Sequence, residues 1–368
     1  RRTFQETDPP EHTRVRVLVA KAFSKPVVAL FEEQIRQICD DILDKVLPLG
    51  QFDAVKMVAR QLPMRMLGQI IGTPDEDLEW LVEKGDALIA NTDSDFTDLV
   101  LDKADTDAYR LMPFRSPAGA ELFDYAKRLM QDKRKRGDTS GVLNLILQPD
   151  REGNVISEEE FRNFFCLLVA AGNDTTRYSI AAGLHALASQ PHLLGELQAG
   201  DDSLWETMPD EVIRWASPTM YFRRTATTDI ELHGKTIREG DKVLLWFASG
   251  NRDEEVFERP YEIDFRRSPN RHMAFGQGGA RLALATPRPD RPGAADGALD
   301  LGALAIQGAL RDASRDAVDR PALPPDGRPV RRRRAGLAVL GPRRLGQPPV
   351  RRQALSRSGR PGKGGPRS

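Results

Sequence analysis

The chain has 368 residues with 54 basic and 54 acidic side chains, a formal net charge of zero, and 40% apolar residues. This length predicts about two domains, or one large enzyme domain, with a sizeable core. The sequence contains no uninterrupted run of about 18 apolar residues, so it shows no candidate membrane span. The two cysteines, Cys39 and Cys166, lie in apolar, helix-like segments, which excludes a disulfide framework and a CxxC zinc site. Because the chain opens with Arg1-Arg2-Thr3 and no initiator Met, we expect a fragment truncated at its N-terminus.

Residues 281–368 differ in composition from the rest of the chain. They carry 19 Lys and Arg against 7 Asp and Glu, hold 12 of the 26 prolines, and contain no aromatic residue. Such a segment buries too little apolar surface to offset its chain entropy, so we predict a disordered or aberrant tail. One explanation is a nucleic-acid-binding tail with Arg331–Arg334 as its basic patch. We favour a shifted reading frame, because Arg, Ala, Gly and Pro are the residues of GC-rich codons, and we expect no nucleic-acid partner.

The first 136 residues predict a series of helices. An amphipathic pattern follows Pro9-Pro10 and runs to Phe23. Apolar residues recur at helical spacing in four later segments, residues 27–47, 54–70, 76–90 and 118–136.

A longer helix follows, with an unusual centre. Ser157 and Glu160 fit a capping box, and the periodic pattern continues to Leu187, before Pro191. Its middle reads Ala170–Thr176, where a glycine costs about 1 kcal/mol relative to alanine. Asp and Thr side chains there compete with the backbone for hydrogen bonds. We therefore expect a functional site at this point, with the helix widened locally into a π-type bulge.

The next segments predict one more helix and then strands. A helix lies between Asp202 and Trp215, with Pro209 inside it and with Glu211 and Arg214 on one face. An ordinary exposed ion pair is the alternative interpretation of those two residues. After Pro218 the apolar period changes to two, which predicts three short strands. They are Tyr221–Ala226, Ile230–Leu232 and Lys242–Phe247, separated by turns at His233-Gly234 and Glu239-Gly240. The fold class is therefore mainly α with small β-sheets.

Five segments, taken in order, resemble the soluble bacterial cytochromes P450 from about residue 4 to residue 279. They are the helix start Asp8–Arg16, the oxygen-activation motif Ala171–Thr176, the ExxR motif Glu211–Arg214, the meander Asn251–His272 and the haem-loop start Phe275–Gly278. The resemblance implies an incomplete P450 fold over residues 1–280. It also implies haem b as cofactor and hydroxylation of a hydrophobic, terpenoid- or steroid-like molecule with O₂. The electrons would come from a ferredoxin-type donor and its NAD(P)H reductase, in the cytoplasm.

The resemblance assigns roles to individual residues. Asp174 and Thr175 resemble the acid–alcohol pair that delivers protons. The alternative for Thr175 is a hydroxyl bonded only to a backbone carbonyl. The expected cofactor-binding residues are His12, Arg16, Gly172, Arg224 and Phe275. For His12, Arg16 and Arg224, which would bind the haem propionates, the alternative interpretation is ordinary surface charge. The expected substrate pocket comprises Leu167, Ala170, Ala171 and Met220, where core packing is the alternative for Leu167. Glu211 and Arg214 would hold the meander, with Arg267 as a third member.

The haem loop departs from the family pattern. The family needs a cysteine whose thiolate binds the iron, in a run Phe-Gly-x-Gly-x-His/Arg-x-Cys-x-Gly. Here Leu282 occupies the cysteine position, Ala280 the His/Arg position and Leu284 the last glycine. We expect no replacement from Cys39, Cys166 or His272, and hence no metal ligand. The chain as written should be inactive, and the alternative function is a non-catalytic remnant or a haem-free scaffold.

Overall fold

The computed structural model describes residues 7–90, 114, 116–138, 141–200 and 203–276. The predicted basic tail lies outside these residues. The helices are α1 (Glu11–Ala20), α2 (Lys25–Ala29), α3 (Glu32–Val46), α4 (Gln61–Ile71), α5 (Leu78–Ile89), α6 (Pro117–Arg136), α7 (Val142–Leu147), α8 (Glu158–Ser189), α9 (Pro191–Ala199), α10 (Leu204–Ala216) and α11 (Phe247–Gly250). Short 3₁₀ turns cover Lys21–Phe23, Leu47–Leu49 and Asp75–Asp77. The mainly helical fold class is confirmed.

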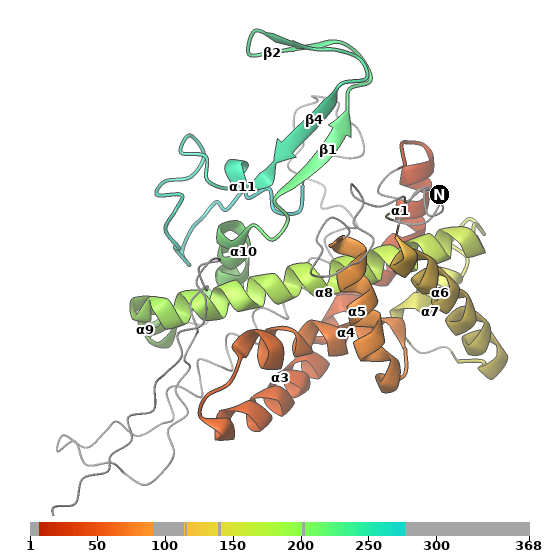
Figure 1. Cartoon of the computed structure of the whole chain (residues 1–368), viewed down its shortest axis with the longest axis horizontal. Coiled ribbons are helices and arrows are strands. Elements are labelled where there is room, and N and C mark those ends of the chain that lie inside the picture. Colours follow the sequence, from red (N-terminus) through yellow and green to blue (C-terminus); the bar gives the residue numbers. More distant parts are fainter. Residues whose placement is uncertain (1–6, 91–113, 115, 139–140, 201–202, 277–368) are drawn as a thin grey trace, which may run out of the picture.

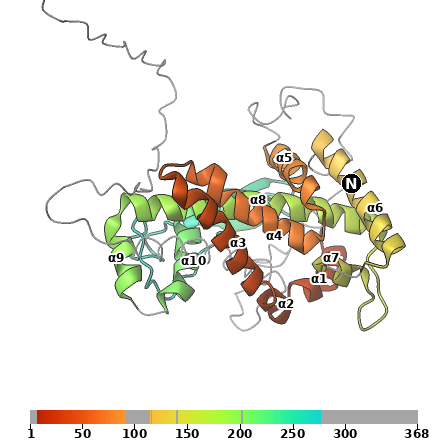
Figure 2. The same ribbon diagram turned by 90° about the horizontal axis from the view of Figure 1, so that it is seen from below.

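Helix α8 crosses the centre of the described structure (Figure 1). It begins with the predicted capping box: the Ser157 hydroxyl accepts the N–H of Glu160, and the Glu160 carboxylate accepts the N–H of Ser157. The other helices surround it. In both views α6 and α7 lie toward its N-terminal end, while α9 and α10 lie at its C-terminal end (Figures 1 and 2). Apolar side chains from α1, α3, α4, α5, α6, α8 and α10 form one core cluster. Within the described ranges, no helix is long and apolar enough to cross a bilayer.

Two small antiparallel sheets follow α10. Strand β1 (Tyr221–Thr225) pairs with β4 (Lys242–Trp246), and Tyr221 lies opposite Trp246. Strand β2 (Ile230–Leu232) pairs with β3 (Lys235–Ile237) across the predicted turn at His233-Gly234. The sequence analysis missed β3, because Lys235–Ile237 has two polar residues followed by one apolar residue and so shows no apolar alternation. The β1–β4 ribbon extends beside α8 and α10 in Figure 1.

Two helix predictions are wrong in detail. Residues 27–47 form two helices, because the N–H groups of Leu30 and Phe31 bond three residues back rather than four and so tighten the chain. Glu32 and Glu33 then favour a new helix N-terminus. The expected π-type bulge in α8 is absent, since α8 is α-helical from end to end. A π-helical turn occurs instead at Val55–Ala59, before α4.

Candidate active site

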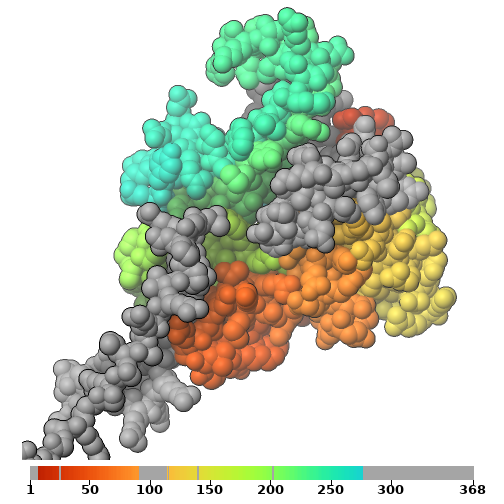
Figure 3. Space-filling view, viewed as in Figure 1, coloured from red at the N-terminus to blue at the C-terminus, as the bar shows by residue number. Residues whose placement is uncertain are grey.

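One side of α8 stays open although most of its middle is buried. Leu167, Asp174 and Thr175 are half-buried, Ala171 is exposed, and Tyr178 is 55% exposed. These residues recur every three to four positions and so share one side of the helix, which we call the open stripe. Light-green surface of α8 is visible in Figure 3 between the green strand region and the orange helices. Both predicted catalytic residues and two predicted pocket residues therefore lie on the open stripe.

Within the open stripe, the hydroxyl of Thr175 is engaged by its own helix. Thr175 Oγ1 donates to the carbonyl oxygen of Ala171 at 2.9 Å. This is the bond that the alternative interpretation expects. The hydroxyl oxygen keeps lone pairs that can accept a further proton donor from the open side.

Asp174 is held by an ion pair rather than by its neighbour Thr175. Its carboxylate accepts a hydrogen bond from Arg177 on the next turn. The same guanidinium donates through Nη1 to Oδ2 of Asp86 in α5 at 3.0 Å. Burial alone would lower the pKa of Arg177, but its hydrogen bonds and charge interactions with the two carboxylates raise it. Arg177 therefore stays protonated and bridges α8 to α5.

The ExxR residues form a buried ion pair. Arg214 Nε and Nη2 lie 2.8 Å from the two oxygens of Glu211, and both side chains are almost inaccessible to solvent. The remaining N–H groups of Arg214 donate to the backbone carbonyls of Asn251, Pro260 and Glu262 at 2.7–2.8 Å. All five donors of the guanidinium are thus used, and the interpretation as an exposed pair is excluded.

The Glu211 carboxylate also binds the chain that follows α11. Arg267 Nε donates to both of its oxygens at 3.1 Å, which is the contact expected for Arg267. Asn270 Nδ2 donates at 3.1 Å and the Asp264 N–H at 2.9 Å. Residues far apart in sequence are therefore fixed on α10 by one carboxylate.

The residues expected to bind the haem propionates, His12, Arg16 and Arg224, lie on two elements. His12 is buried and Arg16 half-buried, four residues apart on α1. Burial lowers the pKa of His12, the charge of Arg16 lowers it further, and Asp8 opposes them. Arg224 lies on β1 and donates through Nη1 to the Arg223 carbonyl at 3.0 Å. His12 and Arg16 therefore lie together on α1, and Arg224 lies on another element, β1.

The start of the predicted haem loop packs beside the β1–β4 ribbon. Phe275 is 43% exposed. A Cβ built on the next residue, Gly276, would lie 3.4 Å from the ring of Phe247. Phe247 follows β4 directly, and the N–H of Ala248 donates to the carbonyl of Met220 at 3.2 Å. Met220 is 57% exposed, so this predicted pocket residue lies near the loop with an open side chain.

Two other predicted site residues lie outside the open stripe: Ala170 is buried and Gly172 is half-buried. Ala170 is buried in the main cluster, because it is rotated by about 100° from Ala171 on the helix. Gly172 faces α4: an added Cβ would lie 3.4 Å from Cδ1 of Leu67, an ordinary contact distance.

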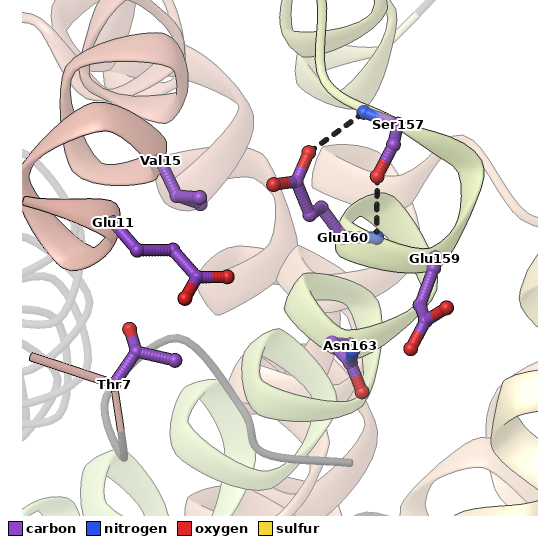
Figure 4. A pocket seen from close by; sticks show the side chains of 7 residues that line it. All are labelled: Thr7, Glu11, Val15, Ser157, Glu159, Glu160 and Asn163. Atoms are coloured by element: carbon purple, nitrogen blue, oxygen red, sulfur yellow. Dashed lines mark hydrogen bonds between the residues drawn. The ribbon is translucent and has the colours of Figure 1, made fainter.

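A separate cavity of about 370 Å³ lies between the first turns of α1 and α8 (Figure 4). Its lining residues are Thr7, Glu11, Val15, Ser157, Glu159, Glu160 and Asn163. None of the predicted site residues lines it, and Glu160 is committed to the helix cap. Among the described residues, no three His, Cys, Asp or Glu side chains are placed to hold a metal ion. This cavity is therefore not the candidate active site.

A model of the cytochrome P450 family matches residues 2–279. The chain belongs to the cytochrome P450 family. It is similar to a methyl-branched lipid omega-hydroxylase of Mycobacterium tuberculosis, at 35% identity over 75% of this chain and 62% of that protein. It is also similar to a steroid C26-monooxygenase of Mycolicibacterium smegmatis, at 32% identity over 75% of this chain and 61% of that protein. The chain thus spans less than two thirds of these two curated relatives.

Solved P450 structures share the fold. One, from Mycobacterium marinum in complex with pseudoionone, has a TM-score of 0.72 at 32% identity and covers 86% of this chain and 71% of its own. Another, from Bacillus megaterium in complex with corticosterone, has a TM-score of 0.71 at 27% identity and covers 86% of this chain and 78% of its own.

The side chains of this P450 do not fit a haem at its axial position. The family implies haem held by a cysteine thiolate, but Leu282, at that position, has no donor atom and lies outside the described residues. Cys166 is buried on α8, where burial raises the pKa of its thiol to about 12 against a smaller opposing effect of Arg162. Its sulfur contacts the Gly119 carbonyl of α6 at 3.8 Å. Cys39 is buried in α3. Both cysteines are therefore enclosed in the core.

Sequence reasoning missed the residues that anchor Asp174. Arg177 could have been found, because it lies three residues after Asp174 and so on the adjacent turn. Asp86 could not, because it is 91 residues from Arg177 and nothing in α5 marks it. Asn173 was quoted in the motif without a role, yet its amide nitrogen lies 3.4 Å from Asp86 Oδ1.

Proposed function

We propose that residues 7–276 form the oxygen- and substrate-facing part of a P450 monooxygenase site. The open stripe of α8 carries this proposal, because it leaves Asp174 and Thr175 accessible on a helix that is otherwise packed in the core. In this role Asp174 and Thr175 hold and transfer protons. Arg16 and Arg224 would provide positive charge for the haem propionates, His12 would offer a ring N–H, and Phe275 would lie beside the haem.

A hydrophobic small molecule is the substrate class that we infer. Leu167 and Ala171 on the open stripe and the exposed Met220 offer apolar surface, which suits a pocket for an apolar ligand. The two curated relatives are named for lipids and steroids, and the two solved neighbours hold pseudoionone and corticosterone. A terpenoid- or steroid-like molecule agrees with all of these.

The reaction needs an external electron source. Inserting one atom of O₂ into a C–H bond leaves the second atom to become water, which consumes two electrons and two protons. We propose a ferredoxin-type donor with its NAD(P)H reductase, as is usual in bacterial members of the family. The protons would reach the site through Asp174 and Thr175.

Binding of a steroid to the full chain tests the pocket. Ala171→Glu places a charge on the open stripe and should weaken binding of labelled corticosterone in equilibrium dialysis by about tenfold, because a charge is costly to bury against an apolar ligand. Ala188→Glu is the matched control, since Ala188 is also an exposed alanine of α8 but lies away from the open stripe. Equal binding by the two variants would contradict the pocket.

The missing axial donor favours a second function, a haem-free scaffold, for the chain as written. Its reduced form under carbon monoxide should show no thiolate-type band, and haem uptake should be weak. The Leu282→Cys variant supplies the donor that the family pattern requires and should gain haem affinity. A thiolate band in the unmodified chain would show that Cys39 or Cys166 reaches the iron, and the scaffold would be wrong.

A further inference from the structure

We propose that Asp86 and Arg177 are positioning residues for Asp174: one guanidinium is shared by two carboxylates, and the docking of α5 sets how much of its charge Asp174 receives. This inference rests on the proton-transfer role proposed for Asp174. It concerns residues of this chain alone and can be tested without haem.

The first step is the packing of α5 on α8. Val169, Asn173 and Arg177 lie four residues apart on α8 and form a second side of the helix, next to the open stripe. A Cβ built on Gly85 of α5 would lie 3.1 Å from Val169 Cγ1 and 3.3 Å from the Val169 carbonyl oxygen. The α5 backbone is therefore seated directly on α8, one residue before Asp86.

The second step is the anchoring of Asp86. Its side chain is only 13% exposed and has partners on α8 at both oxygens: Arg177 Nη1 at 3.0 Å from Oδ2, and Asn173 Nδ2 at 3.4 Å from Oδ1. Asn173 is fully buried, and its amide oxygen has no partner among the described residues. Turning this amide over would aim its oxygen at the Asp86 carboxylate, so the observed orientation is the favourable one. Asp86 is thus fixed in place by α8.

The third step is the competition for Arg177. The guanidinium uses Nη1 for Asp86 and Nη2 for Asp174. Its planar fork allows both contacts at once, which one ammonium group does less well. Asp174 is the more exposed of the two carboxylates, at 37% against 13%. With α5 docked, Asp86 draws part of the positive charge away from Asp174; without Asp86, Arg177 would pair with Asp174 alone.

Carboxyl footprinting on the full chain measures this competition. Carbodiimide and glycine ethyl ester label free carboxylates faster than ion-paired ones, and mass spectrometry resolves Asp86 and Asp174. Arg177→Met should raise labelling at both, by about twofold to threefold, the scale of a partly exposed ion pair. Asp86→Asn should lower labelling at Asp174 by a similar factor, because Arg177 then has a single acidic partner.

The opposite signs separate positioning from simple packing. If Asp86 only held α5 in place, Asp86→Asn would loosen the interface and raise labelling at Asp174; that result, or no change, would overturn the proposal. Arg177→Lys provides a second variant should Arg177→Met fail to fold, and it should release one of the two carboxylates while protecting the other. Release of both, or of neither, would also overturn the proposal.

Arg162 supplies a matched control on the same helix. It bridges Asp124 of α6 at 2.9 Å and Glu158 of α8 at 3.7 Å, and so repeats the arrangement of one arginine between two carboxylates. Arg162→Met should raise labelling at Asp124 and leave Asp174 unchanged; a change at Asp174 would show that the readout is not local. Because the footprinting needs no haem, its failure is distinct from failure of the steroid-binding or carbon-monoxide tests.

Discussion

Replacing Arg214 with Leu should destabilise the fold by about 2–6 kcal/mol. The guanidinium uses all five N–H groups, two for Glu211 and three for backbone carbonyls in the segment after α11. Glu211 would keep Arg267, Asn270 and one backbone N–H as donors. The cost therefore arises mainly from the carbonyls of Asn251 and Pro260, which belong to buried residues and each lose about 1–3 kcal/mol when left without a partner, whereas Glu262 is exposed. That loss is a large share of the roughly 5–15 kcal/mol that stabilises a typical domain.

A second substitution, Arg214→Lys, tests the same reasoning with the positive charge retained. Three ammonium N–H groups cannot serve five acceptors, so at least two partners are lost and we expect a cost of about 2–4 kcal/mol. Urea unfolding followed by the fluorescence of Trp205 and Trp215, both on α10, gives the free energy of unfolding. Arg266→Leu is the control, because Arg266 is 58% exposed and pairs with Glu196 at the surface, which is worth about 0.5 kcal/mol. A loss at Arg214→Lys no larger than in this control would refute the reasoning.

Four further predictions follow from single residues, the last two as a pair. Cys166 should resist alkylation at about pH 8, because burial raises the pKa of its thiol to about 12; rapid labelling of the folded protein, seen by mass spectrometry, would contradict its place in the core. Burial first, and then the charge of Arg16, lower the folded-state pKa of His12, so the unfolded chain binds more protons just below pH 6.5 and stability should fall there as the pH decreases. Urea unfolding should show this slope, and His12→Gln should reduce it. Gly85→Ala should lower the melting temperature, because the new Cβ would lie 3.1 Å from a side-chain atom of α8. In Gly195→Ala the new Cβ meets nothing within 4 Å, so this substitution should stabilise α9 by about 0.5–1 kcal/mol. Changes in melting temperature of the same sign in the two glycine variants would contradict this pair of predictions.

The sequence predicted best where one local rule decides the structure. The start of α8 was found because the capping box from Ser157 to Glu160 involves neighbouring residues, and the observed bonds are the predicted ones. Arg267 was matched to Glu211 through the order of the family motifs, and the contact is present. The turn at His233-Gly234 was found from its own residues, with both at positive φ in the structure.

The sequence failed where tertiary contacts decide. Residues 27–47 have a continuous helical pattern, yet the chain turns at Leu30, whose side chain is 73% exposed. Glu32 and Glu33 favour a helix N-terminus after this point, but the apolar spacing alone does not show the break. Gly172 was singled out by its motif, and the structure adds that Leu67 of α4 lies 3.4 Å from a Cβ built on it. Only the packing of a distant helix could reveal that.

Asp174 and Thr175, the acid and the alcohol of the motif, show the same limit of sequence-based prediction at the candidate site. Asp174 and Thr175 are adjacent in sequence, but successive residues of an α-helix are rotated by about 100°, so their side chains diverge. Asp174 turns toward Arg177, and Thr175 bonds back to the Ala171 carbonyl. A proton moving between them must therefore cross a gap that neither side chain spans, and a bridging water on the open stripe is the simplest carrier. If α5 acts on Asp174 through Arg177 as we propose, the position of Asp174 would decide whether that water can reach both groups.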